Sequence, residues 1–482
     1  MGNPKAFLTI HRQEAGYRPV HERIDDFSEV EQTLNSSDRR TQASRCMDCG
    51  VPFCHWACPL GNKQPEWQDL LYKGRWREAF HVLEQTCDFP EFTGRICPAL
   101  CEKSCVLKLS CDEPVTIREN EASIVEAAFR EGYIQPVRPI RNGKRVAVIG
   151  RGPAGLTAAN QLNRRGYEVT VFEKYELPGG LLRFGIPNFK LGKNIIDRRI
   201  RLMEQEGIVF KVNTMVGNEV SAKEIASTFD AVCIAIGSEV PRDLPIEGRN
   251  LKGVHFALEL LSQQNRILEG IVIPPKDIIN CKGKKILIIG GGDTGSDCVG
   301  TVRRQGAGKV YLIDVGSEPP EHENKAETWP NWPRKMRIST SHEEGCEKLF
   351  QVSTKEIVKD KKGEVTAIRC VKVKVDRGPD GRLRFQDIPG TEFEIPVQRV
   401  YLAMGFLHPS STVLDAFGVE KDTRGNAKTD RPYFTSREKV FACGDARRGQ
   451  SLIVTATSDG RQCAAAVDAW LMGRTALTVF AK

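Results

Sequence analysis

The 482-residue sequence lacks several features that would point to a membrane or a nucleic acid. No stretch approaches the roughly 20 consecutive apolar residues of a membrane-spanning helix. The N-terminal MGNPKAFLTIHRQEAGYRP has no long apolar core followed by a small-residue cleavage site, so it does not resemble a secretory signal. A concentrated excess of positive or negative charge is also missing, because the net charge of +8 is spread along the chain. We therefore expect a cytoplasmic protein that binds neither membranes nor nucleic acid.

Cysteine, by contrast, is abundant, with 16 residues. A cytosolic compartment keeps thiols reduced, which argues against structural disulfides. Seven cysteines are scattered after residue 230, and Cys233 in DAVCIAIG is typical of a buried small hydrophobic residue. Eight others lie in two short segments and are Cys46, Cys49, Cys54, Cys58, Cys97, Cys101, Cys105 and Cys111. Thiolates at these short spacings suit either structural zinc or iron–sulfur clusters.

Three regions follow one another along the chain. The first is Cys-rich, and the apolar residues of PEWQDLLYKGRWREAFHVLEQT, from Trp67 to Leu83, have the spacing of one helical face. The linker VRPIRNGK follows. From Arg145 onwards short apolar runs alternate with helical patterns, and this order starts twice, which predicts two parallel-sheet units. The last segment, from KVFACGD onwards, is expected to fold back onto the first unit.

The first unit begins with a dinucleotide-binding pattern. After the strand RVAVIG comes a GxGxxG turn, which consists of Gly150, Arg151, Gly152, Pro153, Ala154 and Gly155. The glycines allow a tight bend and a close approach to a pyrophosphate, which the helix N-terminus then faces. Glu173 ends the next strand, where a carboxylate binds the hydroxyls of an adenosine ribose. We predict a dinucleotide site here; the alternative is a purely structural turn.

The second unit repeats the pattern. GGGDTG follows KKILIIG and satisfies GxGxxG through Gly290, Gly292 and Gly295. Two such sites suggest a flavoprotein that uses a nicotinamide, because hydride transfer needs both partners.

The nicotinamide coenzyme is not decided by the sequence. Asp314 ends the second strand of this unit, where a carboxylate favours a free 2′-hydroxyl, as in NADH, over the 2′-phosphate of NADPH. The nearest basic residues that a phosphate could use are Arg303, Arg304, Arg334, Lys335 and Arg337. We interpret Arg303 and Arg304 as a solvated helix face, so NADH and NADPH both stay open.

Longer segments resemble the small (beta) subunits of glutamate synthase over essentially the whole chain. They are the N-terminal cysteine set, EFTGRICPALCEKSC, EPVTIRENE, VIGRGPAGL, LPGGLLRFGIPNFKL, IGGGDTGSDCVGT, PPEHENKAETWPNWP and FACGDARRGQSLIVTA. A related module forms the N-terminal half of dihydropyrimidine dehydrogenase and occurs in NADPH:ferredoxin-type oxidoreductases. The PPEHENKAETWPNWP segment looks more like the eukaryotic glutamate synthases that use NADH, in agreement with Asp314.

The resemblance implies an α/β fold in which an N-terminal helical iron–sulfur domain, residues 1–140, precedes two Rossmann-like domains of the glutathione-reductase-like type. Residues 141–253 and 411–482 would form a discontinuous FAD domain and residues 254–410 the NAD(P)H domain. The implied FAD-binding residues are Gly150, Gly152, Pro153, Ala154, Gly155, Glu173, Lys174, Gly179, Gly180, Leu181, Lys190, Val216, Gly444, Asp445, Ser451, Leu452, Ile453 and Val454. The implied NAD(P)H-binding residues are Gly290, Gly291, Gly292, Asp293, Thr294, Asp314, Ala403, Met404 and Gly405.

A neighbouring flavin favours iron over zinc for the clustered cysteines. A flavin accepts a hydride and can release electrons singly, clusters accept them singly, and zinc carries none. By the resemblance, two 4Fe–4S clusters divide the ligands across the two segments. The first would use Cys46, Cys49, Cys54 and Cys105, and the second Cys58, Cys97, Cys101 and Glu121. Cys111 is the rival of Glu121, and Cys87 is not expected to be a ligand.

The implied function is that of the electron-input subunit of glutamate synthase. NAD(P)H would reduce FAD, and electrons would pass through the clusters to a large (alpha) subunit that makes glutamate from glutamine and 2-oxoglutarate. Hydride transfer needs no general acid or base, so no catalytic residue is predicted. One alternative is an NAD(P)H:ferredoxin-type oxidoreductase with a different partner. A non-enzymatic alternative is a zinc-stabilised redox-sensing or scaffold protein.

Overall fold

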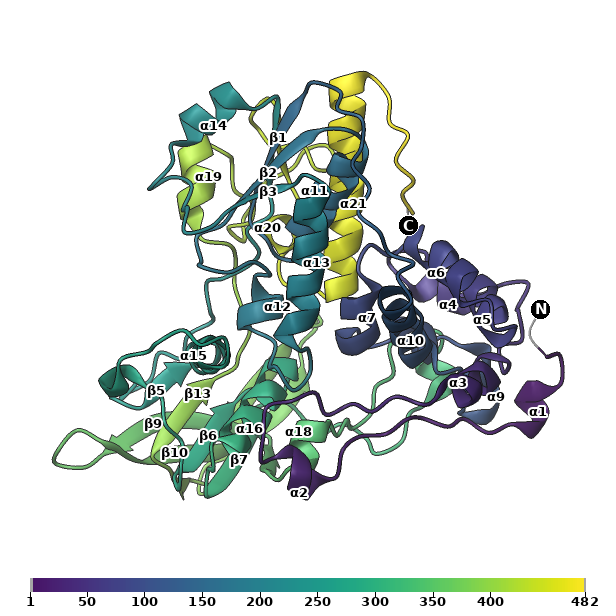
Figure 1. The fold of residues 1–482 in the computed structure, drawn as a ribbon. Helices are drawn as coiled ribbons and strands as arrows, with labels where there is room; N and C mark the ends of the chain where they lie inside the picture. Colours follow the sequence, from purple (N-terminus) through teal and green to yellow (C-terminus); the bar gives the residue numbers. More distant parts are fainter. Residues whose placement is uncertain (1–2, 481–482) are drawn as a thin grey trace.

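A computed structural model describes residues 3–480, which form three lobes (Figure 1). An upper lobe has the long helix α21 along one edge, a cluster of short helices lies beside it, and a lower lobe carries most of the remaining strands. Among the described helices, none is both long and apolar enough to cross a membrane.

The N-terminal lobe is helical. Its helices are α1 (Ala6–Thr9), α2 (Val20–Arg23), α3 (Ser36–Ala43), α4 (Phe53–Ala57), α5 (Gln64–Tyr72), α6 (Trp76–Glu84), α7 (Pro90–Ile96), α8 (Leu100–Lys103), α9 (Val106–Cys111) and α10 (Ile117–Arg130). The single helical face expected between Trp67 and Leu83 is wrong, because the chain turns at Gly74 with φ of 75° and makes two helices. Their apolar residues still share one core, in which Trp67 and Leu83 are both fully buried.

The first parallel sheet has the strand order β14-β4-β1-β2-β3. Its strands are β1 (Arg145–Ile149), β2 (Glu168–Phe172), β3 (Val209–Lys211), β4 (Ala231–Ile234) and β14 (Val440–Ala442). Because β14 pairs with β4, the prediction that the last segment folds back onto the first unit is confirmed. Cys233 is fully buried in β4, also as predicted.

Helices cover both faces of this sheet. They are α11 (Pro153–Arg164), α12 (Leu181–Phe184), α13 (Lys193–Gln205), α14 (Ala222–Thr228), α19 (Ser411–Phe417), α20 (Asp445–Arg448) and α21 (Ile453–Met472). The long α21 packs against α11, as Figure 1 shows. The start of α21 therefore lies close to the first glycine turn, which α11 follows.

The second parallel sheet has the order β5-β13-β6-β7-β8. Its strands are β5 (Val254–Phe256), β6 (Lys285–Ile289), β7 (Lys309–Asp314), β8 (Glu347–Phe350) and β13 (Arg399–Leu402), and an antiparallel layer adds β9 (Val352–Lys359), β10 (Val365–Arg377), β11 (Leu383–Asp387) and β12 (Phe393–Pro396). The helices here are α15 (Ala257–Leu268), η1 (Pro275–Asp277), α16 (Asp293–Arg304), α17 (Lys325–Thr328) and α18 (Thr340–Glu343). The domain limits expected from the sequence stay a prediction.

Candidate functional site

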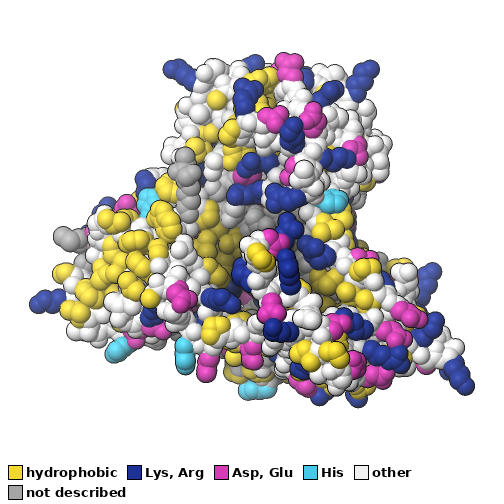
Figure 2. Space-filling model, turned by 180° about the vertical axis from the view of Figure 1, so that it is seen from behind, with side chains coloured by type: hydrophobic (Ala, Val, Ile, Leu, Met, Phe, Trp, Pro, Cys, Tyr) yellow, Lys and Arg dark blue, Asp and Glu magenta, His cyan; other side chains and the backbone are white. Residues whose placement is uncertain are grey.

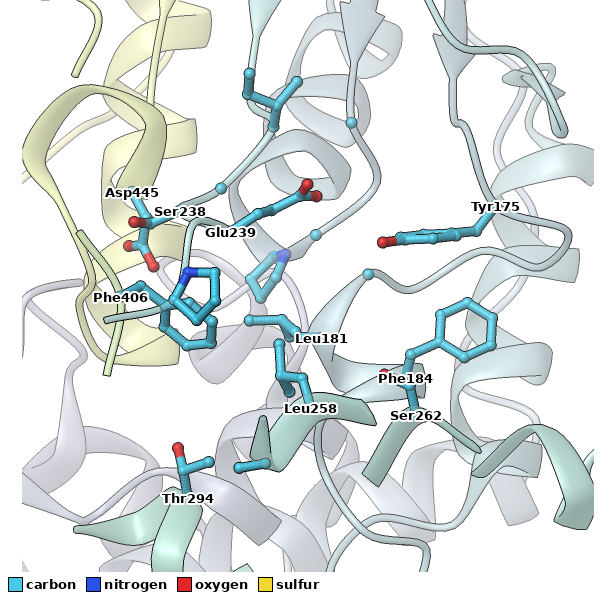
Figure 3. A pocket seen from close by; sticks show the side chains of 18 of the residues that line it. Tyr175, Leu181, Phe184, Ser238, Glu239, Leu258, Ser262, Thr294, Phe406 and Asp445 are labelled. Atoms are coloured by element: carbon cyan, nitrogen blue, oxygen red, sulfur yellow. The ribbon is translucent and has the colours of Figure 1, made fainter. Parts of the chain in front are cut away.

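A cavity of about 430 Å³ lies where the two parallel-sheet units meet. Side chains from both units face it: Asp445 comes from the C-terminal segment and Thr294 from the start of α16, with Leu181 and Leu258 between them (Figure 3). The predicted FAD residues in its wall are Gly150, Gly152, Pro153, Ala154, Glu173, Gly180, Leu181 and Asp445. The predicted NAD(P)H residues in the same wall are Thr294, Ala403 and Gly405. One space therefore adjoins the first glycine turn and Thr294 of the second.

The first turn has the backbone that a dinucleotide needs. Gly150 has φ of 103°, and a Cβ there would collide with the backbone oxygen of Ala235. A Cβ on Gly152 would meet open space instead, so the backbone is accessible to a ligand at that point. Gly155 packs directly against the oxygen of Gly150, as the close approach of helix and strand requires.

Glu173 stands beside this turn. Its carboxylate accepts backbone hydrogen bonds from Arg151 (3.3 Å) and Tyr175 (3.1 Å). Burial raises its pKa, although the Arg151 guanidinium opposes that shift. A second cavity of about 50 Å³ continues past Glu173 and is lined by Lys174 and Val216. Both spaces therefore adjoin Glu173.

The C-terminal segment contributes an acid to the large cavity. Ser451 donates a hydrogen bond to Asp445 (2.5 Å), and burial raises the pKa of Asp445. Gly444 precedes Asp445 with its N–H bound to Asp459 (2.6 Å). Leu452, Ile453 and Val454 then begin α21.

Not every predicted residue reaches the large cavity. Gly179 packs against Arg183, and Lys190 forms an ion pair with Asp297 of α16. On the nicotinamide side, Gly290, Gly291, Gly292, Asp293, Asp314 and Met404 lie outside the cavity wall. Asp314 accepts a hydrogen bond from the N–H of Gly316 (2.7 Å) and packs over Gly291 of the second turn.

The interpretation of Arg304 as a solvated residue is wrong. Its side chain is fully buried, it binds Glu344 with both terminal nitrogens (2.5 and 3.0 Å), and it stacks 3.8 Å from the ring centre of Phe189. Arg303 is half-buried and donates to the backbone oxygen of Ala307 (3.2 Å). Arg304 is therefore committed to an internal ion pair and is not available to a coenzyme phosphate.

Basic side chains nevertheless gather on one face of the junction between the lobes. Figure 2, which shows the face opposite to Figure 1, has Lys and Arg side chains gathered across the hollowed middle of the molecule. Cations so placed attract the phosphates of dinucleotides.

The first cysteine set surrounds a small cavity of about 20 Å³. Its wall contains Cys46, Cys49, Cys54 and Cys105 together with the Phe53 ring. Burial raises the pKa of Cys46 to about 12, and it raises the pKa of Cys54 further. No three acidic, histidine or cysteine side chains within residues 3–480 converge tightly enough for a single metal ion. A four-iron cluster is larger than a single ion and holds its thiolates further apart.

The second predicted set also comes together. Burial raises the pKa of the Cys101 thiol well above the ordinary value, and Cys58, Glu102, Cys97 and Glu121 lie close enough to raise it further. Glu121 on α10 is buried, which raises its pKa to about 7, and it accepts hydrogen bonds from Thr93 and from Asn62 (3.5 Å).

The two other cysteines of this lobe have different surroundings. Cys111 is exposed, and its thiol donates to the backbone oxygen of Leu107 (3.2 Å). Cys87 is buried, with its sulfur 4.0 Å from Glu121 and within electrostatic reach of Cys58. By position, Cys87 is therefore a stronger rival of Glu121 than Cys111 is.

Several residues of the large cavity carry no sequence signal. They are Tyr175, Phe184, Ser238, Glu239, Leu258, Ser262, Arg266 and Phe406. Figure 3 shows the Tyr175 and Phe184 rings at one end of the cavity and Phe406 at the other. They come from loops, from the end of α12 and from α15, where no fixed spacing marks a ligand-binding residue.

Comparison with known proteins agrees with this architecture. Residues 144–460 match the family described as pyridine nucleotide-disulphide oxidoreductase, and residues 23–133 match dihydropyrimidine dehydrogenase domain II, 4Fe-4S cluster. The glutamate synthase (NADPH) small chain of Mycobacterium tuberculosis is 47% identical over 99% of this chain and 98% of its own length. The chain belongs to the glutamate synthase small-chain family. The predicted family and fold class are thus confirmed.

Other members of the family differ in the coenzyme that their names carry. The glutamate synthase (NADPH) small chain of Bacillus subtilis is 41% identical over 99% of this chain and all of its own length. The glutamate synthase (NADH) of Schizosaccharomyces pombe is 42% identical over 98% of this chain, which spans 23% of that longer protein. Among solved structures, FprA of Mycobacterium tuberculosis in complex with NADPH has a TM-score of 0.54 at 18% identity, covers 71% of this chain and 88% of its own, and shows the fold alone.

Proposed function

We propose that this protein is the electron-input subunit of a glutamate synthase. It oxidises NADH or NADPH with FAD and passes the electrons through two 4Fe–4S clusters to a large subunit that makes glutamate from glutamine and 2-oxoglutarate. The iron–sulfur and dinucleotide-binding families that the chain matches, and its small-chain relatives, support this role.

The observation that carries the proposal is that the start of α21 reaches from the cavity, whose wall includes Ala456, to the apolar core around the cysteines. Leu452 and Val454, which flank the first residue of α21, pack in the same hydrophobic core as both cysteine sets. The hydroxyl of Ser458, one turn further along α21, donates to the backbone oxygen of Pro59, which follows Cys58 (2.8 Å). The set that contains Cys58 is therefore the one next to the flavin unit.

The first cysteine set lies toward the surface. Asp48, Gly50 and Val51, on the loop that carries Cys49, are exposed, and Val51 is 72% exposed. We assign the set with Cys58 to the cluster that receives electrons from the flavin, and the set with Cys49 to the cluster that delivers them to the large subunit.

The residues of the cavity bind and orient the two dinucleotides. FAD, when bound, supplies an acceptor for the hydride pair and releases the two electrons one at a time. Glu173 would hold the adenosine ribose, and Asp445, fixed by Ser451, would hold the ribityl chain. Leu181, Leu258 and Phe406 exclude water from the space between the two units. None of these residues needs to give up or accept a proton during hydride transfer.

An anaerobic titration of the purified protein tests this function. We expect flavin absorbance to bleach on addition of NADH or NADPH, and broad iron–sulfur absorbance to bleach with it. Together with the large subunit, glutamine and 2-oxoglutarate, the protein should then form glutamate; without that subunit it should reduce only artificial acceptors. A colourless protein, or a flavin that neither nucleotide reduces, would contradict the proposal.

Asp314 predicts a preference for NADH. Its carboxylate lies over Gly291 of the second turn, where a 2′-phosphate would meet negative charge, and Arg304 cannot compensate because Glu344 occupies it. We expect kcat/KM for flavin reduction to be higher with NADH than with NADPH, and Asp314→Ser to raise the NADPH value by roughly tenfold or more. Asp415→Ser, which changes an exposed acid on α19, is the control. A wild-type preference for NADPH would refute this assignment.

A further inference from the structure

The segment between residues 18 and 30, which we call the N-terminal arm, leaves the helical lobe and crosses the molecule. In Figure 1, α2 lies apart from the other N-terminal helices, beside α18 and α16 of the nicotinamide unit. Hydrogen bonds tie the rest of the arm to the flavin unit, from Val30 N–H to Phe189 oxygen (3.0 Å) and from the Asn188 amide to Phe27 oxygen (2.8 Å). The arm therefore touches both units that form the large cavity.

Arg23 anchors the arm to the nicotinamide unit. Its side chain is 3% exposed, and its Nε lies 2.9 Å from Glu344, whose carboxylate is fully buried. Its Nη2 binds the backbone oxygen of Thr340 (2.7 Å) and the carboxylate of Glu343 (2.9 Å). Three bonds from one buried guanidinium fix the position of α18 against the arm.

The Glu344 carboxylate also connects the arm and α18 to α16. Glu344 also binds Arg304 of α16, the helix that begins at the second glycine turn, and Arg304 stacks on Phe189 of the flavin unit. A buried group of Arg23, Glu344 and Arg304 thus connects the arm, the nicotinamide unit and the flavin unit. Buried charges require such complete pairing, because an unpaired one is strongly unfavourable.

The arm is also fixed at its other end. Glu29 binds the N–H of Gly192 in the flavin unit (2.9 Å) and the guanidinium of Arg95 on α7 (2.9 Å). Glu31, just beyond the arm, pairs with Arg118 of α10. The arm is therefore held at both ends rather than resting loosely on the surface.

We propose that the N-terminal arm clamps the nicotinamide unit against the flavin unit, and that Arg23 is a positioning residue for hydride transfer between the two dinucleotides. The proposal rests on the proposed function, because it concerns the geometry of that same transfer. The two dinucleotide turns belong to separate sheets that share one cavity, so the distance between their ligands depends on how the units are held. A small displacement of reacting groups slows a transfer steeply while leaving binding within each unit intact.

Arg23→Ala tests the clamp. Arg304 still pairs with Glu344 in this variant, so the buried carboxylate keeps a cationic partner. We expect the rate of flavin reduction by saturating NADH, measured by rapid mixing, to fall roughly tenfold to a hundredfold. The dissociation constant of NAD⁺ should change little, and hydrogen exchange should increase in the arm and in α18. Arg23→Lys, which keeps the charge but loses the fork of donors, should give an intermediate rate.

Arg18→Ala is the matched control, since Arg18 lies on the same arm and pairs with Asp26 without reaching the nicotinamide unit. Normal flavin reduction and unchanged exchange in Arg23→Ala would overturn the clamp. If Arg23→Ala loses its flavin, Arg23→Lys decides the matter, and a wild-type rate there overturns the proposal. A wild-type protein whose flavin no nicotinamide reduces would instead refute the proposed function.

Discussion

Glu121→Ala is expected to remove one of the two clusters. Loss of a ligand from a buried four-iron site should lower the iron content by roughly half and remove one set of iron–sulfur signals from the spectrum. Glutamate formation with the large subunit should fall to background, because the electron path is interrupted next to the flavin. Flavin reduction by NADH should continue, since the large cavity lies outside the cysteine sets.

Two cysteine variants make this prediction decisive. Cys111→Ala should keep its full iron content, because Cys111 is exposed and its thiol bonds to a backbone oxygen. Cys87→Ala should keep its iron as well, although its sulfur lies 4.0 Å from Glu121. Loss of iron in Cys87→Ala with retention in Glu121→Ala would identify Cys87 as the fourth ligand. Loss of iron in Cys111→Ala with retention in Glu121→Ala would identify Cys111 instead.

The first glycine turn and the two cysteine-rich segments could be recognised because each depends on local sequence. Gly150 must adopt a positive φ and Gly155 must let a helix approach a strand, so the spacing of the glycines is enough to mark the turn. The division of the cysteines between two sites came from the resemblance, and the cavity lined by Cys46, Cys49, Cys54 and Cys105 accords with it. The ligand assignments themselves await the measurements above.

Long-range contacts could not be predicted in this way. Nothing in the sequence near Arg23 indicates that a residue over 300 positions away, Glu344, would bury and pair with it. Arg304 has the helical spacing of a solvated residue, but it pairs with Glu344 and stacks on Phe189, which are both distant in sequence. The PPEHENKAETWPNWP segment is informative as a family signature. The spacing of its residues does not reveal that the Trp329 ring packs on Phe53 beside the first cysteine set, with 4.7 Å between the two ring centres.

The helix break at Gly74 has a local origin instead. The apolar residues on both sides of Gly74 follow one helical period, and both helices bury them in one core. Periodicity therefore identifies the buried residues correctly while missing the turn. A positive φ at one glycine changes the direction of the chain without changing which side chains are apolar.

Arg461→Ala is expected to have the largest effect on stability. Arg461 of α21 binds the fully buried carboxylate of Asp88 (2.7 Å), which also accepts bonds from Asn160 (2.8 Å) and Gln161 (2.5 Å). These contacts join the cluster lobe to the flavin unit. Removing one partner of a buried pair leaves an uncompensated charge and costs about 3–5 kcal/mol. We expect a correspondingly lower urea concentration for release of FAD, and slower electron transfer from flavin to clusters.

The acid sensitivity of this interface provides an independent test. Burial alone would raise the pKa of Asp88, but Arg461 and Gln161 outweigh burial and hold the pKa below its ordinary value. The pair therefore stabilises the folded protein above the ordinary carboxyl pKa, and this contribution is lost as pH falls through the lower folded-state pKa. The double variant Asp88→Asn with Arg461→Ala should lose less stability than Arg461→Ala alone and should depend less on acidic pH. Arg75→Ala, which breaks an exposed pair with Glu78, should leave FAD release unchanged, and an equal effect in Arg75→Ala and Arg461→Ala would refute the role of the buried pair.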